Sequence, residues 1–143
     1  GGGGGGGAAE ESDQLDAKGL EEASKRYEVL MVNFYAPWCP WSRRLAPVWE
    51  AAAVQLHTEY PKETHRMRIG KVDCTMEPDM CRHHHIQGFP SMRVFRKGSD
   101  VVQHGEHHDH ASYVGDRTVA AITAFAEGLL PAEAAGAARG PPA

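Results

Sequence analysis

The chain has few cysteines, no long apolar run and no large excess of charge of either sign. Three cysteines in 143 residues are too few to hold together a small disulfide-rich fold, so a hydrophobic core must stabilise the domain. No apolar segment approaches the roughly 20 residues that a bilayer-spanning helix needs. The longest, Val29 to Tyr35, is interrupted by Asn33. A formal net charge of −4 gives no reason to expect nucleic acid or an anionic membrane surface as a partner.

The two ends of the chain differ in composition from its centre. Residues 1–14 begin with seven glycines and continue with a short polar stretch, which predicts a flexible linker or tag. Residues 131–143 are rich in Ala, Gly and Pro and lack an apolar period, which predicts a tail or an interdomain linker. One domain is therefore expected over residues 15–130. The glycine-rich start without methionine favours a mature segment or a piece of a longer protein.

Between the ends, the apolar pattern alternates between helical spacing and continuous β-rich runs, with no internal repeat. Pro47 lies inside the longest helical pattern and should kink that helix. This alternation predicts an α/β domain with a mixed sheet and helices on both faces. The expected elements are helices over 15–27, 40–60, 77–84 and about 116–130, and strands over 28–35, 67–74 and 91–96 with a hairpin return from Val101.

The segment with the clearest chemical signature is Trp38-Cys39-Pro40-Trp41-Ser42. It follows a predicted strand and opens a predicted helix, where unpaired N–H groups and the helix dipole favour an anion such as a thiolate. Ser42 lies three residues after Cys39, on the same helix face. Its hydroxyl could donate a hydrogen bond to the sulfur but cannot form a disulfide. The alternative is that Cys39 is a buried, inert cysteine beside two core tryptophans.

Several motifs, in the same order, resemble the protein disulfide isomerases of the thioredoxin superfamily. They are Val32-Asn-Phe-Tyr-Ala-Pro-Trp-Cys39, Lys71-Val-Asp-Cys-Thr75, Ile86-Gln-Gly-Phe-Pro-Ser91 and Tyr113-Val-Gly-Asp-Arg117. The resemblance implies a thioredoxin fold over roughly residues 15–130, that is, a central mixed β-sheet flanked by helices on both faces.

A narrower resemblance is to the plant and algal type C disulfide isomerase-like proteins. It is carried by Ala36-Pro-Trp-Cys-Pro-Trp-Ser42, Cys81-Arg-His-His-His-Ile-Gln-Gly-Phe-Pro90, Phe95-Arg-Lys-Gly-Ser-Asp100 and His107-His-Asp-His-Ala-Ser-Tyr113. In that family one thioredoxin domain is joined to a membrane-anchored, cargo-receptor-like domain. The chain would then be a luminal module of the endoplasmic reticulum or early secretory pathway, with no membrane contact of its own.

The resemblance also implies roles for four further residues. Pro90 matches the cis-proline that lies against the active-site sulfur, and the backbone at Phe89 and Pro90 would pair with an extended client peptide. Lys71 matches a lysine beneath the active site. Arg117 matches an arginine that tunes the second cysteine of dithiol members, so its usual role lacks a target here.

Two departures from the family pattern affect the same half-reaction. Asn33 stands six residues before Cys39, where dithiol members carry a buried acid, and an amide cannot accept the resolving thiol's proton. Ser42 replaces the resolving thiol itself. Trp41 replaces the usual polar or basic neighbour, which predicts a modestly acidic thiol and a more apolar surface.

These observations predict a monothiol module that needs no cofactor and acts on client proteins with thiols or disulfides. Cys39 would form mixed disulfides, and release would depend on a client thiol, glutathione or a partner protein. Isomerisation or retention of clients would remain, whereas dithiol oxidase or reductase activity would be weak or absent. The alternative is a redox-inactive module that binds client peptides without a covalent bond.

The histidines and the two other cysteines allow further hypotheses. Four histidines with two nearby carboxylates could bind zinc, copper or nickel loosely, but they lack tetrahedral spacing and a solvated loop is favoured. Cys74 and Cys81 are close enough in sequence for a local disulfide, and related isomerase domains have such pairs. An oxidising compartment favours the bridge, and a reducing one would leave two small buried side chains. The four candidate metal-binding histidines are His104, His107, His108 and His110.

Overall fold

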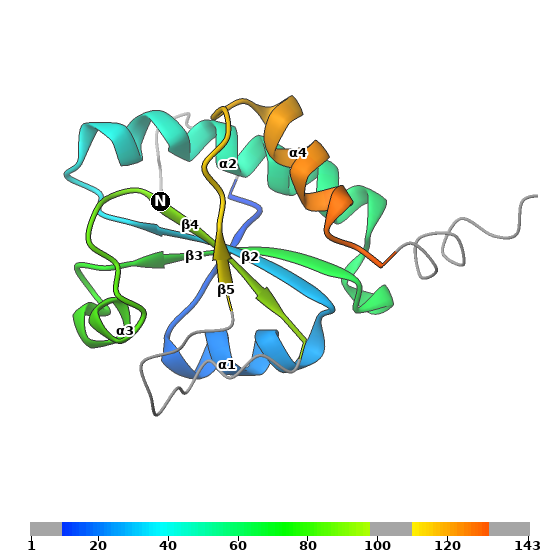
Figure 1. Ribbon diagram of the computed structural model, residues 1–143, viewed down its shortest axis with the longest axis horizontal. Helices are drawn as coiled ribbons and strands as arrows, with labels where there is room; N and C mark the ends of the chain where they lie inside the picture. The colour runs from blue at the N-terminus through cyan, green and yellow to red at the C-terminus, as the bar shows by residue number, and fades with distance from the viewer. Residues whose placement is uncertain (1–9, 98–109, 132–143) are drawn as a thin grey trace, which may run out of the picture.

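The computed structural model describes residues 10–97 and 110–131, which form a five-stranded mixed sheet with helices on both faces (Figure 1). The strands are β1 Asp13–Gln14, β2 Val29–Tyr35, β3 Met67–Asp73, β4 Ser91–Arg96 and β5 His110–Ser112. The helices are α1 Ala17–Arg26, α2 Pro40–Glu59, α3 Pro78–His83 and α4 Val119–Gly128, with a 3₁₀ turn at Lys62–Thr64. The predicted fold class is confirmed.

The strands lie in the order β1-β3-β2-β4-β5. This order brings the residues of the candidate site together at the edge of the sheet formed by strand ends, where β2 and β3 finish and β4 begins. The central strand β2 runs parallel to β3 and antiparallel to β4. The carboxyl ends of β2 and β3 therefore lie beside the start of β4. Cys39 follows β2 and Pro90 precedes β4, so two residues 51 positions apart in the chain lie at the same edge.

Each face of the sheet has its own hydrophobic core. On one face, α2 and α4 cover a cluster that includes the fully buried Trp49, whose indole N–H donates to the Gly70 carbonyl at 3.0 Å. On the other face, α1 and α3 cover a cluster around Phe34 and Phe95 (Figure 1). β2 contributes side chains to both clusters, which explains why its sequence is nearly all apolar.

The helix boundaries follow from local capping. The Asp16 carboxylate accepts a hydrogen bond from the Gly19 N–H at 2.7 Å and caps α1. Thr118 caps α4 in the same way through Ala121. The helix α2 continues through Pro47 to Glu59. None of the helices in the described part of the chain is long and apolar enough to span a bilayer.

The N-terminal boundary differs from the prediction. Residues 10–14 were expected to belong to a linker, yet β1 pairs in parallel with β3, and Asp13 forms two hydrogen bonds with Arg68 at 2.7 and 2.8 Å. The domain therefore begins before Leu15. A two-residue edge strand has no recognisable sequence period, because alternation needs several residues to be visible. The expected start of the hairpin return at Val101 lies outside the described residues, and the observed return strand is β5.

His57 is a buried histidine in the last turn of α2, and its surroundings hold it in the neutral form. Its Nε2 accepts a hydrogen bond from the Ile69 N–H at 3.0 Å, so Nδ1 carries the proton and donates to the Glu11 carboxylate at 2.9 Å. Burial lowers the pKa of His57, and nearby Arg68 adds to that effect, whereas the hydrogen bond to Glu11 opposes it. Protonation at Nε2 would place two hydrogen-bond donors against each other.

We therefore expect acid to destabilise the domain through His57. The unfolded chain binds a proton at a pKa of about 6.5, while the folded state does not, so stability is full above that pH and falls below it. The expected loss is about 1–2 kcal/mol between pH 7 and pH 5, measured by urea denaturation. His57→Gln should flatten this pH dependence, and exposed His65→Gln should not. An equal slope in both variants would contradict the assignment.

Candidate functional site

Cys39 lies at the N-terminus of the longest helix. It is the N-cap residue of α2, with extended backbone angles φ −82° and ψ 126°, and Pro40 follows in the first helical position. Proline is suited to this position because its missing N–H would have no partner there. The Cys39 N–H donates to the Ala36 carbonyl at 3.0 Å, and the Cys39 carbonyl accepts the Arg43 N–H at 3.0 Å. The turn thus leaves the sulfur facing the open end of the helix.

The environment of Cys39 stabilises a thiolate. The pKa of the thiol is lowered, first by a hydrogen bond from the Ser42 N–H and further by the Trp41 N–H, the Ser42 hydroxyl and the charge of Arg43, against an opposing effect of burial. Only 7% of Cys39 is exposed. The sulfur is therefore largely covered, but its surroundings favour the thiolate, unlike those of a cysteine in a purely apolar core.

A cis-peptide bond lies against the sulfur, as the family resemblance implied. The bond between Phe89 and Pro90 is cis. The Cys39 thiol points to the Phe89 carbonyl, with 3.8 Å between sulfur and oxygen. Trp38 packs edge-on against Phe89, with 5.8 Å between the ring centroids. The motif after β2 and the segment before β4 thus form one surface.

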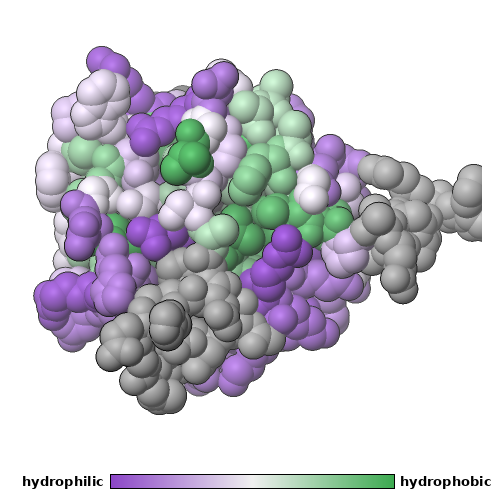
Figure 2. All heavy atoms as spheres, viewed as in Figure 1, coloured by the Kyte–Doolittle hydropathy of each residue, from purple (hydrophilic) through white to green (hydrophobic). Residues whose placement is uncertain are grey.

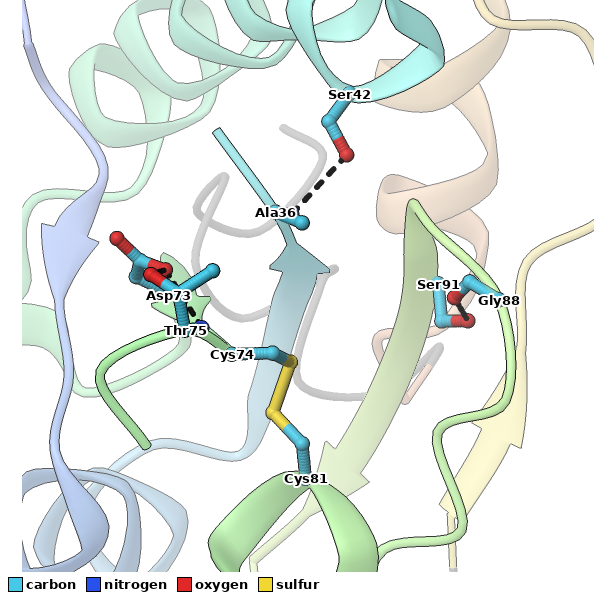
Figure 3. The surroundings of a disulfide bond; sticks show 8 residues. All are labelled: Ala36, Ser42, Asp73, Cys74, Thr75, Cys81, Gly88 and Ser91. Atoms are coloured by element: carbon cyan, nitrogen blue, oxygen red, sulfur yellow. Dashed lines mark hydrogen bonds between the residues drawn. A yellow bond between two sulfur atoms is a disulfide. The ribbon is translucent and has the colours of Figure 1, made fainter. Parts of the chain in front are cut away.

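Ser42 lies in the first turn of α2, three residues after Cys39. It is 3% exposed, and its hydroxyl oxygen accepts a hydrogen bond from the Ala36 N–H at 3.2 Å (Figure 3). The same hydroxyl contributes to the lowered pKa of Cys39. Ser42 therefore contacts both the loop before the helix and the Cys39 sulfur.

A small cavity of about 150 Å³ is lined in part by Ser42, Asn33 and Lys71. Asn33 is 3% exposed, and its side-chain oxygen has no hydrogen-bond partner among the described residues. The Lys71 ammonium donates to the Glu50 carboxylate at 2.9 Å and to the Glu10 carboxylate at 3.2 Å. Burial alone would lower the pKa of Lys71, but these two carboxylates raise it.

Glu50 is a site residue that the sequence did not reveal. Its carboxylate accepts hydrogen bonds from the Glu11 N–H at 2.6 Å, the Ser12 N–H at 2.8 Å and the Ser12 hydroxyl at 2.6 Å, in addition to Lys71. Burial would raise the pKa of Glu50, but these donors lower it. A single glutamate on a helix usually faces water, so no pattern distinguished it from the exposed glutamates nearby.

Two arginines of α2 beside the motif were also missed. The prediction was that Trp41, by removing a possible positive charge near the sulfur, leaves the thiol only modestly acidic. The Arg43 guanidinium donates to the Trp38 carbonyl at 2.7 Å and lowers the pKa of Cys39 slightly further, after the larger effect of the hydrogen bonds from Ser42 and Trp41. The Arg44 guanidinium lies 4.9 Å from the centre of the Trp41 ring. Trp38 and Trp41 are 63% and 56% exposed, so the apolar surface predicted at this motif is present.

Arg117 lies in the loop between β5 and α4. It lines an open groove beside Pro90, between the start of β4 and the loop from β5 to α4. Within residues 10–97 and 110–131, no hydrogen bond or ion pair joins it to Cys39 or Ser42. On the face shown in Figure 2, hydrophobic side chains gather over α4, whereas hydrophilic ones predominate over α3.

Cys74 and Cys81 form a disulfide, so the bridge favoured for an oxidising compartment is present (Figure 3). It joins the end of β3 to α3, on the face of the sheet opposite α2. Cys39 is consequently the free thiol of the chain.

The four histidines considered as weak metal-ligand candidates fall wholly or partly outside the described residues. His104, His107 and His108 lie outside the described residues, and of His110 only the backbone, in β5, is described. The described part of the chain contains no group of three or more metal-ligating side chains close enough to hold an ion.

Comparisons with known proteins agree with this architecture. The thioredoxin family model matches residues 14–127. Protein disulfide isomerase-like 5-4 from rice is 51% identical over 114 residues, which are 79% of this chain and 24% of that protein. Protein disulfide-isomerase 5-3 from Arabidopsis thaliana is 48% identical over 81% of this chain and 24% of its own length. The chain thus spans about a quarter of these curated relatives.

Comparison with solved structures also finds the thioredoxin-like fold. The zinc-bound form of human ERp44 superposes with a TM-score of 0.71 at 28% identity, over 82% of this chain and 30% of that one. The J-Trx1 fragment of ERdj5 gives a TM-score of 0.67 at 29% identity, over 82% of this chain and 51% of that fragment.

Proposed function

Because this chain belongs to the thioredoxin family and is related to the protein disulfide isomerase-like proteins, we propose that it is a monothiol module that forms mixed disulfides with client proteins through Cys39. The single observation that carries the proposal is the placement of this free thiol. It lies at the N-terminus of α2 with a lowered pKa, beside a cis-proline, and has a serine where a resolving cysteine would stand.

The proposed reaction balances with one thiol. The Cys39 thiolate attacks one sulfur of a client disulfide, a bond forms between the two sulfurs, and the other client sulfur leaves as a thiolate that takes a proton from water. A client thiol, glutathione or a partner protein then attacks the mixed disulfide and restores Cys39. The module can rearrange or retain clients in this way, but its net oxidation or reduction of clients is slow.

The compartment of this reaction is proposed to be the lumen of the endoplasmic reticulum or the early secretory pathway. One relative, 30% identical over 78% of the chain, is named endoplasmic reticulum resident protein 44 from mouse. The Cys74–Cys81 disulfide fits an oxidising environment. We further propose, from the same resemblance, that the module belongs to a longer membrane-anchored protein.

Replacing Cys39 by serine tests the proposal directly. The wild-type chain, mixed with a client that carries a reactive disulfide, should give a client adduct on a non-reducing gel that disappears with dithiothreitol. Cys39→Ser should abolish the adduct, because no other free thiol is present. Wild-type protein should also reduce insulin poorly while retaining activity on scrambled ribonuclease. Rapid insulin reduction by the wild type would contradict the monothiol mechanism.

A non-covalent binding module is the second candidate function, favoured by the exposed rings of Trp38 and Trp41 beside the cis-proline. Aromatic rings that are more than half exposed can bury apolar client side chains without any sulfur chemistry. Cys39→Ser separates the two functions, because client binding at full strength in that variant would exclude covalent capture. A double replacement of Trp38 and Trp41 by alanine should weaken non-covalent binding most.

A further inference from the structure

Two arginines line the groove beside Pro90, Arg93 and Arg117, and neither forms an ion pair with a carboxylate of the described residues; the charge of Asp116 acts on Tyr113 in the same lining. The groove has a volume of about 290 Å³ and lies between the start of β4 and the loop from β5 to α4. Neither aspartate nor glutamate contributes to its lining, although the whole chain has a net charge of −4. The lining residues are Pro90, Ser91, Met92, Arg93, Ser112, Tyr113, Val114, Gly115 and Arg117.

Arg93 is the more buried of the two arginines in this groove. Its side chain is partly buried, and its one hydrogen bond is a long contact of 3.5 Å to the His84 carbonyl. A guanidinium has five N–H donors in a planar fork that suits a carboxylate. Burial alone accounts for the lowered pKa of Arg93, with no carboxylate to offset it. Partial desolvation of a cation without an anion carries a cost, and an incoming carboxylate would relieve it.

The groove is placed to contact a client that is attached to Cys39. The Cys39 sulfur lies 3.8 Å from the Phe89 carbonyl oxygen, and Pro90 is the first lining residue of the groove. Arg93 follows Pro90 by three residues in β4, which is about 10 Å along a strand. An extended peptide with its cysteine at Cys39 covers that distance in about three residues.

We propose that this groove binds an acidic side chain of the client, about three residues from the client cysteine, through Arg93 and Arg117. This inference rests on the proposed function and adds the substrate class to it. The module then prefers cysteines with a nearby aspartate or glutamate. Arg93 makes the main contact because it is partly desolvated, and the exposed Arg117 contributes a weaker, salt-sensitive attraction.

The test uses peptides whose single cysteine is activated as a mixed disulfide with thionitrobenzoate. Attack by the Cys39 thiolate forms the Cys39–peptide disulfide and releases the coloured thionitrobenzoate thiolate, whose absorbance gives the rate. Matched peptides carry Asp, Asn or Lys three residues before or after the cysteine. We expect the best Asp peptide to react about fivefold faster than its Asn counterpart at low salt, and the Lys peptide to react more slowly than both.

Three variants locate the effect. Arg93→Gln should reduce the Asp preference to near one, and Arg117→Gln should reduce it in part and lower its salt dependence. Arg117 is exposed, so that variant tests the groove even if Arg93→Gln folds poorly. The matched control is Arg26→Gln at the end of α1, which precedes the far end of β2 and should leave the preference unchanged.

The outcomes separate this inference from the proposed function. Reaction with the Asn peptide but no Asp preference in the wild type would overturn the acidic groove and leave the monothiol function standing. No reaction with any peptide would overturn both. A third outcome is that Cys39 reacts faster with glutathione disulfide than with its uncharged ethyl ester, while the peptides show no charge preference. The groove would then recognise the carboxylates of glutathione, and the client inference would be overturned.

Discussion

Replacing Ser42 by cysteine should convert the module into a dithiol reductase. The new thiol would lie one helical turn from Cys39, at a residue whose hydroxyl already interacts with that sulfur. It could attack the mixed disulfide from within the molecule, which releases the client without an external thiol. We expect insulin reduction by dithiothreitol to be accelerated about tenfold or more over the wild-type chain, measured by the turbidity of the precipitating insulin chain.

Replacing Asn33 by aspartate extends this experiment and supplies its control. The Asn33 side chain lines the same cavity as Ser42 and has an unpartnered oxygen, so an aspartate at this position would place a base close to a thiol at position 42. The double variant Asn33→Asp with Ser42→Cys should exceed the single Ser42→Cys variant near neutral pH. Asn33→Asp alone should stay as slow as wild type, because it has no resolving thiol. Equal rates for Ser42→Cys and Cys39→Ser would contradict the geometry of the site.

Replacing Glu50 by alanine should be the most destabilising change at the site. Glu50 and Lys71 are both nearly buried, with side-chain exposures of 8% and 10%. Removing the carboxylate leaves the Lys71 ammonium with only the exposed Glu10, and leaves the N–H groups of Glu11 and Ser12 without their acceptor. Breaking a buried, hydrogen-bonded ion pair typically costs about 3–5 kcal/mol. Chemical denaturation measures the loss as a shift in the midpoint.

Two comparisons test whether the ion pair causes this loss. Glu59→Ala removes an exposed glutamate from the same helix and should change stability by less than about 0.5 kcal/mol. The double variant Glu50→Leu with Lys71→Met removes both charges. It should be more stable than Glu50→Leu alone but less stable than the wild type, because the N–H donors of residues 11 and 12 stay unpaired. A loss below about 1 kcal/mol for Glu50→Ala would contradict the buried clamp.

The same residues show why the N-terminal segment was misjudged. Composition assigned residues 10–14 to a polar linker, and polar residues are typical of linkers. In the folded chain, Ser12 and Asp13 bind Glu50 and Arg68, which lie 38 and 55 residues further along the chain. A polar segment is ordered when buried partners elsewhere satisfy its groups, and no local pattern carries that information.

The sequence alone was sufficient for the fold class, the elements from Val29 to Arg96, and the position of Cys39 at the start of a helix, because each depends on local rules. Apolar period marks helices and strands, and a cysteine between a strand and a helix lies at the helix N-terminus. Family resemblance added the cis bond before Pro90 and the pairing of Cys74 with Cys81. The tertiary structure alone decided which distant charges meet. It placed Glu50 with Lys71, Arg43 near the sulfur, and Arg93 in a groove without a carboxylate, because electrostatic partners are chosen by distance in space and not by spacing along the chain.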